Sequence, residues 1–162
     1  SFQKLRFENP QGDTLAARLD LPEGESPCAY ALFAHCFTCS KDLRAVGAIS
    51  RALNRQGIGV LRFDFTGLGE SEGDFADTNF SSNVDDLVVA ADFLAERYEA
   101  PRILVGHSLG GAAVIAAANA DGPPSRFVRA PMTLFAKETA EDSAHAYVRS
   151  DPEGSPLNTA CT

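Results

Sequence analysis

The feature that most constrains this chain is a Gly-x-Ser-x-Gly segment, Gly106 to Gly110, set between an apolar run and an alanine-rich run. The apolar run, 103–105, is typical of a buried strand, and the alanine-rich run, 112–118, is typical of a helix. A strand that turns into a helix within so few residues forces the turn residue, Ser108, into strained backbone geometry. The residues two positions away must then lack side chains. The segment therefore predicts a nucleophile elbow, in which the serine hydroxyl stands above the edge of a sheet.

Such an elbow places two further groups beside the Ser108 hydroxyl. The amide of Leu109 lies next to it, and the positive end of the following helix lies beneath it. A serine held in this way is placed to attack a carbonyl carbon, so we predict Ser108 as a nucleophile. The alternative is a simple glycine-containing turn, because the five-residue pattern is short and occurs in unrelated chains.

Length and charge limit the classes of function. A chain of 162 residues, 44% of them hydrophobic, fits one globular domain with a real core. The net charge of -8 and the pI near 4.8 argue against nucleic acid or an anionic membrane as a partner, because both would repel the chain. No apolar run approaches the roughly twenty residues that a membrane span needs. We therefore expect a cytoplasmic protein that acts on a small molecule.

The four cysteines are too few and too clustered for a secreted disulfide framework: Cys28, Cys36, Cys39 and Cys161. A reducing compartment is the expectation. Cys36 and Cys39 form a Cys-x-x-Cys pair, which is compatible with a redox dithiol or with half of a metal site, but no second pair completes a zinc site. We favour thiols that act as small apolar side chains lining a loop.

Strands and helices alternate along the first two thirds of the chain. The predicted strands are 2–8, 14–21, 29–34, 58–65 and the strand that enters the elbow, and the predicted helices are 42–56, 82–97 and the elbow helix to about residue 119. The first two strands form an antiparallel hairpin, and the later ones are apolar on both faces, as in a parallel sheet. This order predicts an α/β fold: a three-layer αβα sandwich around a mostly parallel sheet.

The composition changes after residue 118, where a stretch rich in Gly and Pro begins. We predict three segments: a core over 1–118, a remodelled C-terminal segment over 119–149 that packs on the core, and a disordered tail over 150–162. Within the second segment, 127–136 is strand-like and 137–148 is compatible with a short helix.

Three segments, 33–42, 62–71 and 106–111, together resemble the α/β-hydrolase superfamily in their order and spacing. The likeness extends over about the first 118 residues and looks closest to the N-terminal hydrolase domain of bacterial proteins that fuse it to an OsmC-like domain. It implies a serine esterase-like hydrolase whose sheet is shortened on the C-terminal side. The superfamily has roughly a hundred residues beyond the elbow helix for its acid and histidine, whereas forty-four residues follow Ala118 here.

The resemblance also implies roles for residues near the elbow. The superfamily carries His-Gly-x after its third strand, and His35-Cys36-Phe37 matches this motif with Cys36 in the place of glycine. The amides of Phe37 and Leu109 are then the expected oxyanion-hole donors. His35 and His107 are candidates for contacts with substrate. The alternative for His35, which we favour over proton transfer, is a loop histidine that orders its own turn, and His107 occupies a position that is usually structural.

The superfamily places its acid and its histidine after the nucleophile. His145 is the one histidine beyond Ser108, so it is the predicted general base, with Asp142 as the acid that orients it. The other candidate acids are Glu141, Glu138 and Asp121. The alternative is that these residues form a solvated helix face whose histidine contacts nothing. Asp64 resembles an aspartate that braces loops in this superfamily, and we favour that role over membership of a triad.

Two functions from different classes follow. The first is a serine hydrolase that acts on small carboxylic esters and needs no metal or cofactor. The second is an inactive, truncated hydrolase-fold module that binds a ligand or assembles as a dimer. We expect a homodimer, because the elbow strand would lie near an open sheet edge unless the tail or another chain covered it. Thiol redox chemistry at Cys36 and Cys39 is the least favoured function.

Overall fold

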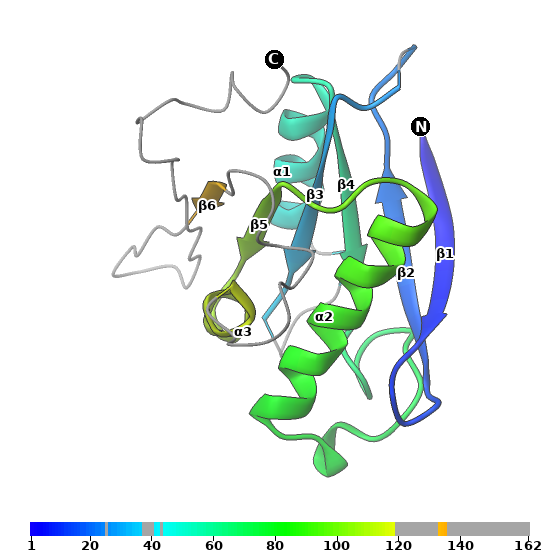
Figure 1. Cartoon of the computed structure of the whole chain (residues 1–162), viewed down its shortest axis with the longest axis vertical. Coiled ribbons are helices and arrows are strands. Elements are labelled where there is room, and N and C mark those ends of the chain that lie inside the picture. Colours follow the sequence, from blue (N-terminus) through cyan, green and yellow to red (C-terminus); the bar gives the residue numbers. More distant parts are fainter. Residues whose placement is uncertain (25, 37–40, 43, 119–132, 136–162) are drawn as a thin grey trace.

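The computed structural model of the chain describes residues 1–24, 26–36, 41–42, 44–118 and 133–135. Six strands in these ranges form one sheet in the order β1-β2-β4-β3-β5-β6. Helix α1 covers one face of the sheet, and helices α2 and α3 cover the other (Figure 1). The predicted three-layer α/β architecture is therefore confirmed.

The elements follow the predicted order. The strands are β1 (Phe2–Glu8), β2 (Thr14–Asp20), β3 (Ala29–Ala34), β4 (Ile58–Phe63), β5 (Ile103–Gly106) and β6 (Thr133–Phe135). The helices are α1 (Arg44–Asn54), α2 (Phe80–Arg97) and α3 (Leu109–Ala118), with a short 3₁₀ turn, η1 (Phe75–Asp77), before α2. Strands β1 and β2 are antiparallel, β2 pairs antiparallel with β4, and β3 pairs in parallel with both β4 and β5.

The central strands are buried on both faces, as their unbroken apolar runs predict. Their side chains alternate between two hydrophobic clusters. In β4, Leu61 and Phe63 join the cluster beneath α2 and α3, whereas Val60 joins the cluster beneath α1. Because alternate residues of a strand point to opposite faces, one short strand contributes to both halves of the core.

The ends of two helices test the local predictions. Gly57, predicted to end the first helix, has a φ of +78°, a left-handed conformation typical of glycine at a helix end. Helix α2 begins at Phe80, two residues earlier than predicted. Its N-cap is Asn79, whose side chain accepts a hydrogen bond of 2.9 Å from the Ser82 amide, while the Ser82 hydroxyl accepts one of 3.0 Å from the Asn79 amide. The sequence had suggested Ser82 as the capping residue, but asparagine caps helices as well as serine does, and Ser82 is instead the third helical residue of a capping box.

Strand β6 lies beside the elbow strand. Residues 133–135 pair in parallel with residues 103–105 of β5, within the segment 127–136 that the sequence marked as strand-like. The chain itself therefore covers the edge whose exposure suggested a homodimer, and the dimer stays a prediction. The predicted helix over 137–148 and the tail over 150–162 lie outside the described residues. Within the described ranges, no helix combines the length and the apolar composition that crossing a membrane requires.

Candidate active site

The predicted elbow is present between β5 and α3. Ser108 has a φ of 55° and is the one non-glycine residue with a positive φ in the described part of the chain. L-residues rarely adopt this left-handed conformation, because the Cβ atom then crowds the backbone. Ser108 is half-buried, and the helix begins at the next residue. The strained turn expected from the sequence is therefore a feature of the structure.

The two flanking glycines are required by close backbone contacts. A Cβ atom at Gly106 would lie 2.4 Å from the Cα of Gly111, and one at Gly110 would lie 2.3 Å from the carbonyl oxygen of Ala34. Both separations are far shorter than carbon atoms tolerate. The amide of His107 also donates a 2.9 Å hydrogen bond to the Ala34 oxygen. The start of α3 is thus held directly against the end of β3.

The amide of Leu109 stands at the N-terminus of α3. Within the described residues it has no hydrogen-bond partner, because it is the first residue of α3, whereas the Gly110 amide donates to His107 and the Gly111 amide donates to Ser108. The Leu109 side chain is 43% exposed. The positive end of the helix dipole adds to the attraction that such an amide has for negative charge. Its role as an oxyanion donor stays a prediction.

His35 lies in the interior at the end of β3. Its side chain is 1% exposed, and its Nδ1 atom lies 2.5 Å from the carbonyl oxygen of Cys36. Its Nε2 atom faces Asp64 at 3.4 Å from Oδ1, and its ring packs edge-on against Phe65. Both ring nitrogens thus face protein oxygens. This geometry favours the histidine that orders its own turn over a contact with substrate. His107, on the elbow, is half-buried.

Asp64, immediately after β4, braces two loops. Its carboxylate accepts hydrogen bonds from the amides of Lys41 at 2.7 Å and Glu70 at 3.1 Å, and the Lys41 ammonium lies 3.2 Å from its Oδ2 atom. Gly69 has a φ of +54°, and a Cβ atom there would lie 2.3 Å from Oδ2 of Asp64. The loop after β3 and the glycine-rich loop after β4 are therefore both closed onto one carboxylate, the role that the resemblance suggested.

The surroundings of Asp64 keep it ionised. Burial alone raises the pKa of this carboxyl, but the contact with His35, the amides of Lys41 and Glu70 and the Lys41 charge outweigh burial and lower the pKa to about 2. Burial lowers the pKa of Lys41, but its contacts with Asp42, Glu70 and Asp64 outweigh this effect and raise the pKa above the usual value. The pair is charged at neutral pH.

Arg62 holds the same loop through a second set of contacts, and the sequence analysis missed it. Its side chain is buried in β4, its Nε atom lies 2.7 Å from Oδ2 of Asp20, and its guanidinium donates a short hydrogen bond to the carbonyl oxygen of Lys41. Lys41 is therefore fixed through its amide, its carbonyl and its ammonium. The available signal was a charged residue inside an otherwise apolar strand, since a buried arginine needs a partner.

Several predicted site residues lie outside the described residues: Phe37, Cys39, Asp142 and His145. The structure thus unites the elbow with the ends of the loops after β3 and β4, and the base and acid stay predictions. In the described ranges, no group of three or more His, Cys, Asp or Glu side chains is placed to hold a metal ion. Cys28 and Cys36 are disulfide-bonded, which differs from the free thiols that we expected.

This geometry agrees with a comparison of the chain with protein families. The family model described as serine aminopeptidase, S33, matches residues 28–145, which is more than half of the chain. The chain belongs to this family of α/β-hydrolases.

Solved structures give the same fold. The esterase domain of a Rhodothermus marinus protein is 58% identical to the chain, with a TM-score of 0.59, over 73% of this chain and 45% of that one. Est1E from Butyrivibrio proteoclasticus, solved with ferulic acid, is 29% identical, with a TM-score of 0.65, over 70% of this chain and 46% of that one. A serine hydrolase without a lid from Xanthomonas campestris is 29% identical, with a TM-score of 0.64, over 73% of this chain and 56% of that one.

The match therefore spans about half the length of these three structures. No curated protein sequence matches the chain.

The strain at Ser108 leads to a stability prediction. Because a left-handed φ disfavours any residue with a Cβ atom, Ser108→Gly should be more stable than Ser108→Ala by about 1 kcal/mol. The measurement is urea unfolding followed by circular dichroism. The control is the same pair of substitutions, to glycine and to alanine, at Ser81, an exposed position in α2. There the glycine variant should be the less stable of the two, since glycine disfavours helices. A glycine variant at Ser108 that is less stable than the alanine variant would contradict the geometry.

The lowered pKa of Asp64 predicts acid sensitivity. Its folded pKa of about 2 lies below the usual 3.8, so its ionised form stabilises the fold above pH 4, and this contribution is lost as the pH falls towards 2. Between pH 5 and pH 2 the native protein should lose about 2 kcal/mol more unfolding free energy than Asp64→Asn, whose side chain does not titrate. The measurement is urea unfolding across this pH range. Parallel pH profiles for the two proteins would refute the assignment.

Proposed function

We propose that this protein is a serine hydrolase that acts on small carboxylic esters through an acyl-enzyme on Ser108. The observation that carries the proposal is the elbow: a serine at a φ of 55° beside the Leu109 amide, which has no partner within the described residues. A second support is the 58% identity to the esterase domain of the Rhodothermus marinus protein. Covalent catalysis by serine needs this combination of a raised hydroxyl and a nearby amide.

In the proposed mechanism, the Ser108 oxygen attacks the ester carbonyl carbon while His145 takes its proton. His145 then gives that proton to the departing alcohol, and water later releases the acid by the same route. Asp142 holds the imidazole in the required orientation. The amides of Phe37 and Leu109 donate hydrogen bonds to the oxyanion of each tetrahedral intermediate, a stabilisation that costs no rearrangement if the amides are already in place. The scheme uses no metal or cofactor.

The contacts around Lys41 support the part assigned to Phe37. The loop that contains Phe37 is bounded by two described ends, Cys36 and Lys41. His35 and its contact with Asp64 order the first end. Asp64 and Arg62 hold the amide and the carbonyl of the second end. An oxyanion hole requires preorganised amides, and fixing both ends of a loop reduces the conformations open to its backbone.

A second candidate is the inactive hydrolase-fold module that binds a ligand or assembles as a homodimer. The observation that favours it is coverage, because the match spans about half the length of the similar structures. The family model is described as serine aminopeptidase, a name that refers to the cleavage of amide bonds. An elbow of this kind serves both amide and ester substrates, so the experiment must measure both kinds of bond cleavage. We also propose that the protein is cytoplasmic and that it is related to the hydrolase domain of OsmC fusion proteins.

Hydrolysis of p-nitrophenyl acetate and butyrate tests the proposal. Ser108→Ala should lower kcat/KM by at least about 10³-fold, because the attacking atom is lost. His145→Ala should lower kcat by a similar factor with little change in KM, whereas Ser81→Ala, which removes an exposed hydroxyl of α2, should leave both constants unchanged. Alanine p-nitroanilide measures amide hydrolysis in parallel.

Equal ester hydrolysis by the native protein and by Ser108→Ala would favour the inactive module. Cleavage of the anilide alone, lost in Ser108→Ala, would keep the nucleophile and reject the ester class.

A further inference from the structure

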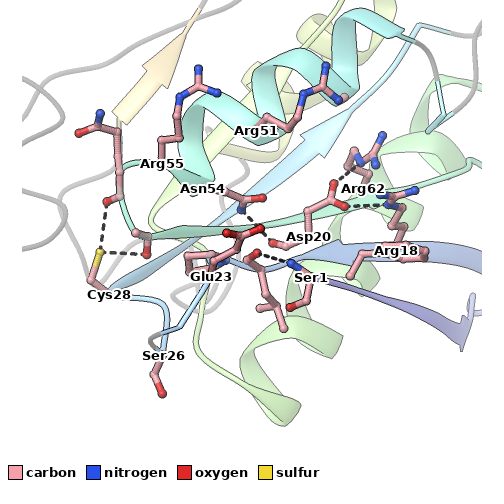
Figure 2. Close-up of a pocket in the computed structure, with 16 residues that line it drawn as sticks. Ser1, Arg18, Asp20, Glu23, Ser26, Cys28, Arg51, Asn54, Arg55 and Arg62 are labelled. Atoms are coloured by element: carbon pink, nitrogen blue, oxygen red, sulfur yellow. Dashed lines mark hydrogen bonds and ion pairs between the residues drawn. The ribbon is translucent and has the colours of Figure 1, made fainter.

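A cavity of about 890 Å³ lies beside α1, away from the elbow. Its wall includes Cys28, just before β3, and Gly57, just before β4, so it opens at the N-terminal ends of the parallel strands. Ser108 follows the opposite, C-terminal end of β5. Other parts of the wall come from α1, from the end of β2 and the connector after it, from the start of β1 and from β4 (Figure 2). The cavity is therefore separate from the candidate active site.

The wall of this cavity is basic, although the chain is acidic. Four arginines line it, Arg18, Arg51, Arg55 and Arg62, together with the two carboxylates of Asp20 and Glu23. Four guanidiniums against two carboxylates leave an excess of two positive charges in a chain whose net charge is -8. A concave surface of one sign concentrates its field, so this region attracts anions although the whole protein repels them.

The two carboxylates do not neutralise the arginines equally. Asp20 is shared between Arg18 and Arg62, with Nε–O distances of 2.7 Å to each. Figure 2 shows these pairs together at one end of the cavity. Within the described residues, Arg51 and Arg55 have no ion pair. Among the described residues, their guanidiniums therefore have no carboxylate that neutralises them.

Arg51 and Arg55 come from the same stretch of chain, and the Arg55 amide donates a 3.1 Å hydrogen bond to the carbonyl oxygen of Arg51. Both are exposed, and they lie four residues apart, at and just beyond the last turn of α1. Cations are favourable at the C-terminal end of a helix, but two like charges at this spacing repel. An anion that bridges them would relieve that repulsion and accept two charge-assisted hydrogen bonds from each planar guanidinium.

We propose that this cavity binds a small anion that carries two or more phosphate or carboxylate groups, with Arg51 and Arg55 as its principal ligands. The volume lies in the range that small-molecule sites occupy. Arg18 and Arg62 form the basic floor with Asp20, and Glu23 and Ser26 supply acceptors for hydroxyl groups of the ligand. The proposal does not rest on the hydrolase activity, because its principal ligands, Arg51 and Arg55, take no part in the candidate active site; Arg62 alone touches both, through the carbonyl of Lys41.

Calorimetric titration of the full 162-residue chain with pyrophosphate, and separately with citrate, tests this site at low ionic strength. The native protein should bind at least one of these probes saturably with one site. The double variant Arg51→Gln, Arg55→Gln should bind at least about tenfold more weakly, because it loses the charge-assisted contacts. Both positions are exposed and glutamine is a good helix former, so the variant should fold normally, which circular dichroism checks.

The matched control is Arg44→Gln, Arg97→Gln. It removes the same charge from two exposed helical arginines outside the cavity, and it should bind within about twofold of the native protein. Absence of saturable binding to both probes by the native protein would overturn the proposal. Equal weakening in the two double variants would also overturn it, since it would show only the effect of net charge. Binding of a hexaglutamate peptide without binding of either small probe would show that the site takes an acidic protein segment, and the proposed small anion would be wrong.

Discussion

The candidate site depends on one close backbone approach, that of Gly110 to the carbonyl oxygens of Ala34 and His35. Because no side chain separates them, the first turn of α3 rests on the end of β3, and the loop after β3 begins beside the elbow. The neighbouring approach of Gly106 to Gly111 lets the helix start directly after the strand. Any Cβ atom at these positions would force the helix away from the sheet. The serine, the helix N-terminus and the loop after β3 would then no longer share one region of the molecule.

A buried network of charges holds the loops around that region. Asp64 ties the loop after β3 to the loop after β4, and Arg62 ties the former to β2 through Asp20. Removing charges from water is costly, and such a network is stable only when each charge is paired and hydrogen-bonded. The same requirement makes it a good positioning device, because a shift of Lys41 would leave several buried groups without partners. The network reaches from the wall of the arginine-lined cavity to the base of the candidate oxyanion loop.

The sequence predicted the features that depend on neighbours along the chain. The elbow at Ser108, the helix stop at Gly57 and the apolar central strands all follow from local residue patterns, and the structure contains each of them. The start of α2 was misplaced because Asn79 and Ser82, three positions apart, are equally suited to cap a helix. The partners of Arg62 escaped prediction, since Asp20 and Lys41 are each more than twenty residues away and only the folded sheet brings them together. The base and the acid were inferred from family order alone, because no local residue pattern marks them.

The most direct test of the central claim is to ask whether Ser108 is a reactive nucleophile. The protein is incubated with a fluorophosphonate probe, in which a serine oxygen displaces fluoride from phosphorus, and the adduct is located by mass spectrometry of peptides. The account predicts a single adduct per chain, on the peptide that contains Ser108, and none after prior unfolding in urea, because the reactivity comes from the folded elbow. An adduct on other serines, or the same labelling in folded and unfolded protein, would contradict it.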